Sequence, residues 1–145
     1  MESRAKFWVA LLTLCLVGAL GCGGRAGTAQ VSGRVLYKDG TVPQGAVCVV
    51  RFQPAADSPA KIRKAASGEI EKDGWFKAFT RNPGDGVFVG KYDVTFSVLQ
   101  DVTDSRTSLI DKKYTRAKTT PYHVTIDDDV SDLDFVIEPL PAGKK

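Results

Sequence analysis

Short runs in which apolar and polar residues alternate make up most of the chain after residue 29. The plainest is "GKYDVTFSVLQ", where Tyr92, Val94, Phe96 and Val98 fall on one face and the residues between them on the other. Strict alternation over this length predicts a strand with one buried face. The same reasoning predicts strands at 30–37, 46–54, 122–126 and 132–138, and a hairpin at 67–79.

Turn residues separate these runs. Asp39-Gly40 follows the first predicted strand, and Asp73-Gly74 stands in the middle of the predicted hairpin. Asp-Gly accepts the positive φ that tight hairpin turns require, so both pairs are expected at turns. Pro54 ends the second strand because proline cannot donate to a ladder.

The remaining segments contain no amphipathic helix. Residues 55–66 lack a clean period of either kind and predict a surface loop, and residues 101–120 predict a long loop or a short helical turn. About seven strands at short spacing predict an all-β fold, a single seven-stranded antiparallel sandwich of two sheets. We expect this domain to occupy residues 30–140 and residues 141–145 to form a tail.

The N-terminal segment has the pattern of an export signal. Its apolar run, residues 7–21, is 15 residues long, which is shorter than the roughly 20 that a membrane-spanning helix needs. Arg4 and Lys6 precede the run, and small residues follow it. We therefore expect residues 1–21 to be a signal peptide and residues 22–29 to be a flexible tether.

The end of the run, Ala19-Leu20-Gly21-Cys22, resembles the lipobox of bacterial lipoproteins. In that motif a diacylglyceryl group is attached to the cysteine sulfur, and cleavage follows just before the cysteine. The usual leucine three places before the cysteine is Ala19 here. The resemblance implies lipidation of Cys22 and a mature protein tethered to a membrane of the cell envelope, outside the cytoplasm. An ordinary signal peptide with an incidental cysteine is the alternative.

Charge and cysteine content bear on the expected partners and on disulfide formation. The chain has 20 Lys and Arg against 17 Asp and Glu, and residues 1–21 hold two of the basic residues and one of the acidic ones. This near-neutral balance gives no electrostatic case for nucleic acid as a partner. Cys15 leaves with the signal and Cys22 takes the lipid, so no intramolecular disulfide is expected. Cys48 then remains as a small buried apolar residue.

Three stretches together resemble the carboxypeptidase regulatory-like domains: "VSGRVLYKDGTVPQGAVCVVRF", "GEIEKDGWFKA" and "GKYDVTF". The resemblance implies their transthyretin-like (prealbumin-like) fold, a seven-stranded Greek-key sandwich. Residues 110–138 are similar to the end of small lipoproteins of this type from planctomycete-like bacteria. The resemblance covers nearly the whole mature chain and implies a fold without an activity. The shared residues are Gly33, Asp39-Gly40, Pro43, Gly45, Asp73-Gly74, Phe76, Gly90, Tyr92 and Val94. We expect turns at the Asp-Gly pairs, Phe76 in the core, and Tyr92 buried with its hydroxyl on a backbone partner.

The catalytic residues of enzymes on related folds can be compared with the residues of this chain. Transthyretin-like hydroxyisourate hydrolases use several histidines, an arginine and a C-terminal Tyr-Arg-Gly-Ser, and intradiol dioxygenases need two histidines and two tyrosines around iron. This chain has His123 alone and ends in "PAGKK". No motif supports a serine or cysteine nucleophile. We therefore expect no catalytic residue and no cofactor, with His123 a half-exposed strand residue and a hydrolase only a distant alternative.

Two charged segments offer ligand chemistry. Aspartate oxygens suit calcium, and the candidates in "IDDDVSDLD" are Asp127, Asp129 and Asp132, although the spacing does not match an EF-hand loop. A solvated turn is the interpretation we favour there. The basic residues from Lys112 to Lys118 suit anionic lipid or polysaccharide, and a solvated surface is again favoured.

Trp75 is the candidate ligand contact. It follows a tight turn and points opposite to Phe76, so one of the two rings is expected near the surface. Exposed rings in sandwich loops can stack on sugars, as in starch-binding-like modules with a similar fold. The interpretation we favour is that Trp75 covers the outside of its sheet beside Phe79.

The sequence as a whole predicts a lipid-anchored, non-catalytic cell-envelope protein that serves as a structural or protein-interaction module. A carbohydrate-binding module of the envelope is the alternative. The expected partners are a membrane, through the lipid, and an envelope protein or polysaccharide.

Overall fold

The computed structural model describes residues 27–104 and 106–141. The predicted all-β class is confirmed, and the one helical segment in this part of the chain is a single short turn. The elements are β1 (Thr28–Ala29), β2 (Val31–Tyr37), β3 (Val47–Pro54), β4 (Ala66–Glu69), β5 (Trp75–Ala78), β6 (Val87–Phe88), β7 (Gly90–Leu99), the 3-10 helix η1 (Lys112–Thr115), β8 (His123–Ile126) and β9 (Val130–Ile137).

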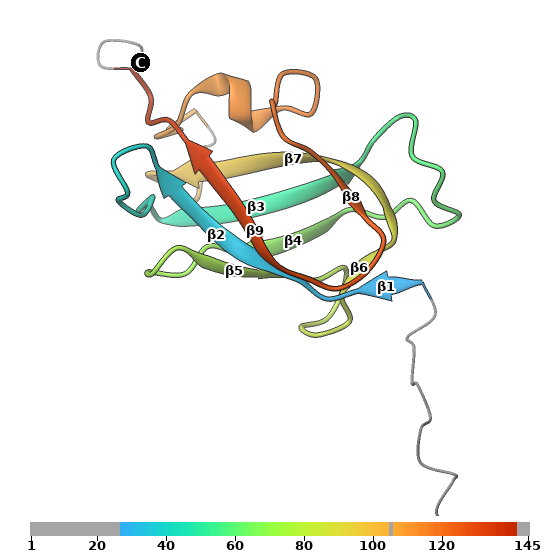
Figure 1. Ribbon diagram of the computed structural model, residues 1–145. Coiled ribbons are helices and arrows are strands. Elements are labelled where there is room, and N and C mark those ends of the chain that lie inside the picture. The colour runs from blue at the N-terminus through green and yellow to red at the C-terminus, as the bar shows by residue number, and fades with distance from the viewer. Residues whose placement is uncertain (1–26, 105, 142–145) are drawn as a thin grey trace, which may run out of the picture.

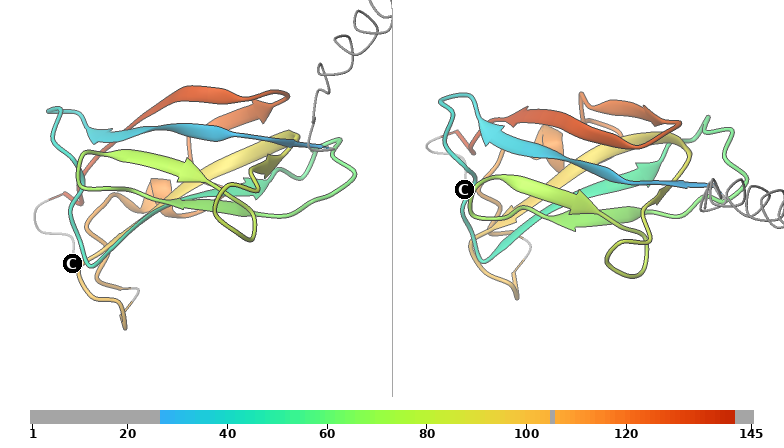
Figure 2. Two further views of the ribbon diagram at one scale, coloured as in Figure 1. Left: turned by 90° about the horizontal axis from the view of Figure 1, so that it is seen from below. Right: turned by 60° about the horizontal axis from the view of Figure 1, so that its bottom comes forward.

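Two sheets lie face to face (Figures 1 and 2). The first has the order β5-β2-β9 and the second the order β4-β3-β7-β8, while β1 and β6 form a separate two-stranded ladder. Along β7, Tyr92, Val94, Phe96 and Val98 are directed into the space between the sheets, as the sequence predicts, and the alternation of burial is interrupted only at Thr95, which is buried as well. The core therefore consists of the inward faces of the two sheets.

The strand pairing differs from the sequence prediction at several points. β2 pairs with β5 and β9, and β3 pairs with β4 and β7. The turn at Asp39-Gly40 therefore carries the chain from one sheet to the other and closes no β2–β3 ladder. The β2–β9 pair is parallel, so the purely antiparallel arrangement expected from the sequence is wrong there. Turn chemistry fixes a local reversal, but which strands become neighbours depends on packing of the whole sheet.

Both Asp-Gly turns have the predicted backbone conformation. Gly40 has φ of 83° and Gly74 has φ of 87°. The side chains of Asp39 and Asp73 each accept a hydrogen bond from the backbone amide two residues later, at 2.9 and 3.1 Å. The second turn joins β4 to β5, which lie in different sheets, so the regular hairpin expected at 67–79 is wrong; an isolated bridge pairs Ser67 with Phe79. The Asp side chain and the following glycine stabilise each reversal locally, which is why the sequence reveals both.

Aromatic rings fill the centre of the core. The ring of Phe135 on β9 lies 5.0–6.5 Å, centroid to centroid, from four other rings. Those four come from both sheets and from the segment before β8: Phe52, Phe76, Phe96 and Tyr122. The predicted place of Phe76 in the core is confirmed, since only 1% of it is exposed.

The start of the described chain was not anticipated from the sequence. Thr28 and Ala29, placed in the expected tether, form β1 and pair with β6, and Ala29 is buried. A two-residue strand is too short to give a periodic signal.

In residues 101–120 the expected short helical turn is confirmed at η1. Within the described ranges, no helix has the length and apolar character needed to span a membrane.

Tyr92 buries its ring and donates its hydroxyl to the Phe88 carbonyl at 2.6 Å, as the sequence predicts. Burial raises the pKa of this hydroxyl. The bond ties β7 to β6 at the corner between them. We expect Tyr92→Phe to lower the free energy of unfolding by about 1 kcal/mol, the net value of one such bond. Urea unfolding measures the change, and an unaltered midpoint would show that the bond contributes nothing.

Candidate functional site

Trp75 lies on the outer face of the three-stranded sheet. It is 39% exposed, whereas its neighbour Phe76 is buried, so the predicted opposition of the two rings is confirmed. Arg34 on β2 stands directly across from Trp75, and its guanidinium carbon lies 5.3 Å from the centre of the indole ring. This cation–π contact covers part of the ring. Asp134 on β9 flanks Arg34 on the other side.

The Trp75 face combines an aromatic surface with hydrogen-bonding groups. On this outer face Ser32 and Lys77 form the cross-strand pair nearest to Arg34 and Trp75, and the pattern of exposure directs these side chains away from the core. An amphipathic ring beside charged and hydroxyl groups can contact a sugar through its face while the polar groups bind hydroxyls. Because the Arg34 guanidinium covers part of the indole face, the ring surface left for a ligand is smaller than the sequence alone suggests.

His123 has a positioned partner that sequence reasoning missed. Its Nδ1 lies 2.7 Å from Oδ1 of Asp93, across the β7–β8 ladder on the outer face of the four-stranded sheet. Both residues sit at outward positions of their strands, but only the register brings them together. Such a carboxylate orients an imidazole for proton transfer. No serine, threonine or cysteine of residues 27–104 or 106–141 is hydrogen-bonded to the other ring nitrogen, so the pair lacks the nucleophile of a hydrolytic triad.

The three calcium candidates are not brought together as a ligand set. Asp129 accepts a hydrogen bond from the Gln30 backbone amide at 2.6 Å, which joins the β8–β9 turn to the start of β2. Asp127 borders a pocket near β6, and Asp132 lies exposed on β9. In the described part of the chain no three His, Cys, Asp or Glu side chains are grouped to hold a metal ion.

Among the basic residues from Lys112 to Lys118, one forms an ion pair and the others are exposed to solvent. Lys112, Arg116 and Lys118 are exposed. Lys113 contacts Oε2 of Glu138 at 2.5 Å, and Lys38 forms an ion pair with the other oxygen of Glu138. Hydrogen bonding to Glu138 raises the pKa of Lys113 to about 12, and the two ammonium groups lower the pKa of Glu138 to about 2. This ion cluster joins η1, the β2–β3 connection and the end of β9.

The lowered pKa of Glu138 gives a pH dependence of stability. A carboxylate whose pKa falls on folding stabilises the fold above its unfolded pKa, near 4.5, and loses that contribution as pH falls towards 2. We therefore expect wild type to have the higher melting temperature than Glu138→Gln at pH 6, with the gap closing between pH 4.5 and 2. Melting curves across that range test this. A gap that stays constant would show that the ionisation of Glu138 does not contribute.

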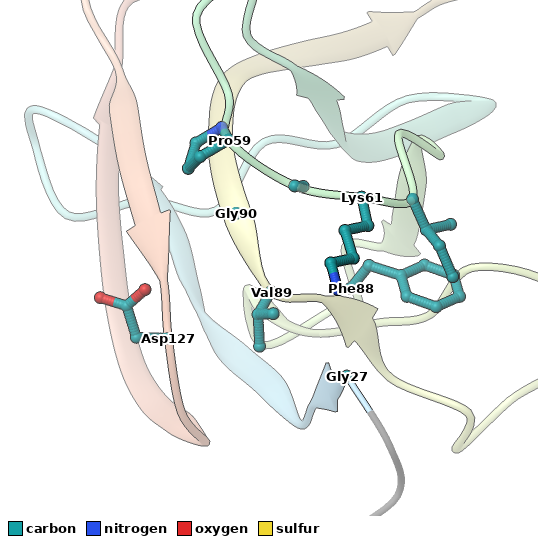
Figure 3. A pocket seen from close by; sticks show the side chains of 9 residues that line it. Gly27, Pro59, Lys61, Phe88, Val89, Gly90 and Asp127 are labelled. Atoms are coloured by element: carbon teal, nitrogen blue, oxygen red, sulfur yellow. The ribbon is translucent and has the colours of Figure 1, made fainter.

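An apolar pocket lies at the end of the molecule where the described chain begins (Figure 3). Its volume is about 400 Å³. Gly27, the β6–β7 corner and the loop after β3 form its walls, with Asp127 on a further side. The lining residues are Gly27, Pro59, Ala60, Lys61, Ile62, Phe88, Val89, Gly90 and Asp127.

The wall formed by the loop after β3 is held in place by several bonds. The Arg63 guanidinium donates to the carbonyls of Ala55 and Ala56. Ser58 accepts from the Lys91 backbone amide at 3.0 Å, and Asp57 pairs with the Lys91 ammonium at 2.8 Å. This pairing lowers the pKa of Asp57. The pocket wall is therefore fixed to the start of β7.

Of the two cysteines in the predicted mature chain, the structure describes Cys48. Cys48 packs against the core but is partly exposed, where the sequence predicts a buried residue, and partial burial raises the pKa of its thiol. Cys22 and the predicted signal peptide lie outside the described residues.

Comparison with protein-family models, with curated proteins and with solved structures found no match for this chain. The resemblance to the carboxypeptidase regulatory-like domains stays a prediction from the motifs quoted above.

Proposed function

We propose that this chain is a lipid-anchored, non-catalytic protein of the cell envelope that acts as a structural or protein-interaction module. The observation that carries the proposal is the run "LVGALGC", in which a short apolar segment preceded by basic residues ends at Cys22. A diacylglyceryl group on this cysteine supplies two acyl chains, enough for stable anchoring where a single chain gives only marginal binding.

We further propose that the domain is a transthyretin-like, carboxypeptidase regulatory-like sandwich with Greek-key connections. Seven strands in two facing sheets of three and four support this proposal. So do the links from β2 to β3 and from β4 to β5, each of which joins one sheet to the other. The shared motif residues have mechanical roles in turns and core, which fits a scaffold that presents its outer surfaces to a partner.

Membrane fractionation tests the anchor. We expect the full chain, produced in a bacterium that processes lipoproteins, to sediment with membranes, and Cys22→Ala to lose most of that association. Cys48→Ala is the matched control, because it removes a thiol without touching the lipobox, and it should stay with the membranes. Retention of Cys22→Ala in the membrane fraction would contradict the proposal.

A carbohydrate-binding module is the second candidate, favoured by the exposed Trp75 among polar neighbours. Under this hypothesis the full chain is retained by immobilised polysaccharides, Trp75→Ala loses the retention, and iodide quenches the Trp75 emission until sugar protects it. Val136→Ala is the control, since Val136 is exposed on β9 of the same sheet. Absence of retention across a panel of polysaccharides would eliminate this candidate and leave a protein partner.

A further inference from the structure

The apolar pocket lies close to the proposed anchor. Gly27 borders the pocket, and Cys22 precedes it by five residues. Five residues span at most about 18 Å even when fully extended. A lipid on Cys22 would therefore hold this end of the molecule within about 18 Å of a bilayer surface. This step rests on the proposed function.

The pocket rim carries exposed apolar side chains. Ile62 is 46% exposed and Val89 is 37% exposed, and both line the hollow together with Pro59 and Phe88. Single exposed hydrophobic residues are ordinary, but here two of them flank an apolar hollow. Removal of such side chains from water is favourable, and acyl chains at a bilayer interface provide the apolar surroundings.

One side of the pocket carries basic residues and the other an acidic residue. Lys61 and Lys64 are exposed on the loop that carries Ile62, and a lysine can lay its aliphatic stem along lipid while its ammonium reaches the phosphates. Anionic lipids attract such residues. Asp127 stands on the opposite side of the hollow, after the end of β8. The side formed by residues 59–64 is thus suited to lipid, and the Asp127 side to water.

We propose that residues 59–64 together with Val89 form a membrane-seating surface, on which the anchored domain rests with Ile62 and Val89 inserted at the bilayer interface. The occupant of this surface is the phospholipid of the membrane that holds Cys22. β7 begins at the pocket and runs for ten residues to the far end of the sheets (Figure 1), a distance of about 30 Å. The far end and the outer sheet faces, including Trp75, then stay free for a partner.

Tryptophan quenching by brominated lipid tests the orientation. The lipidated protein with Trp75→Phe is reconstituted in vesicles of phosphatidylcholine and phosphatidylglycerol, with brominated phosphatidylcholine as the quencher. Removal of the signal peptide also removes Trp8, so a single tryptophan introduced by Ile62→Trp reports alone. The matched control is Val102→Trp, which replaces an exposed residue in the loop after β7.

We expect Ile62→Trp to lose much of its emission in brominated vesicles and Val102→Trp to keep its emission. A seated side chain would lie about 5–10 Å into the headgroup and acyl boundary, within reach of bromine near the top of the chains. Equal quenching of both, or of neither, would overturn the seating surface. A blue-shifted Ile62→Trp emission that brominated lipid leaves unchanged would also overturn it and would identify a protein, such as a second copy, as the occupant.

The mass of the N-terminal peptide from the same preparation separates the two proposals. A lipid-modified Cys22 with unquenched Ile62→Trp would overturn the seating surface and leave the anchor intact. An unmodified Cys22 would overturn the anchor and the seating surface together.

Discussion

Phe135→Ala is expected to destabilise the protein by about 3–5 kcal/mol, the range for removing a buried phenylalanine ring. Phe135 is 3% exposed and its ring contacts four other rings from both sheets and the segment before β8. Its loss leaves a cavity that these neighbours cannot fill without leaving their own packing. Domains of this size are stable by only about 5–15 kcal/mol, so the variant would lose a large part of its stability.

Denaturant unfolding measures the Phe135→Ala effect, with Val136→Thr as control. Val136 is the next residue on β9, is 44% exposed, and keeps a β-branched side chain in the substitution. We expect the control to change the free energy of unfolding by less than about 0.5 kcal/mol. Equal effects of the two substitutions would contradict the central role given to the aromatic cluster.

Gly33→Ala is expected to cost about 3 kcal/mol, the upper part of the range for overpacking a close contact. A Cβ added at Gly33 would fall 2.0 Å from the Leu133 carbonyl oxygen and 2.6 Å from its carbonyl carbon. These are backbone atoms of β9, at the irregular register of the parallel β2–β9 pair. The methyl group can be accommodated only if β9 moves away from β2.

Gly40→Ala separates crowding from backbone strain. Gly40 has φ of 83°, and nothing lies within 4 Å of a Cβ added there. The substitution therefore costs only the left-handed conformation, about 1–2 kcal/mol. Thermal unfolding of the two variants should show the larger loss for Gly33→Ala, and faster amide hydrogen exchange in β2 and β9 for that variant alone. A smaller loss for Gly33→Ala than for Gly40→Ala would contradict the close approach of the two strands.

Local features of the fold were predictable because each has a local cause. The alternation in residues 90–99 marks a strand with one buried face, and the two Asp-Gly pairs mark turns that their own side chains stabilise. The burial of Tyr92, with its hydroxyl on a backbone carbonyl, follows from its position on the inward face. Each signal lies within a few residues of the structure it predicts.

Pairing between distant segments was not predictable in the same way. The parallel β2–β9 ladder joins segments about a hundred residues apart, and no turn sequence specifies it. The Asp93–His123 contact depends on the register of β7 and β8. The pocket beside Gly27 needs the loop after β3 and the β6–β7 corner at one end of the sheets. Such features arise from packing of the whole molecule, and a single sequence contains no direct signal for them.

Under the proposed function, one end of the chain attaches the protein to a membrane and the domain contacts other molecules. Cys22 would hold one end of the sandwich at a membrane, and the outer faces with Trp75 and the Asp93–His123 pair would meet other envelope components. Among the residues described, neither face brings together the nucleophile, base and orienting group that hydrolytic chemistry requires.

Mass spectrometry of the N-terminal peptide of the mature protein tests the central claim most directly. The account predicts that the mature chain begins at Cys22 and that this residue carries the added mass of a diacylglyceryl thioether. An unmodified Cys22, or a chain that still contains residues 1–21, would contradict the lipid anchor.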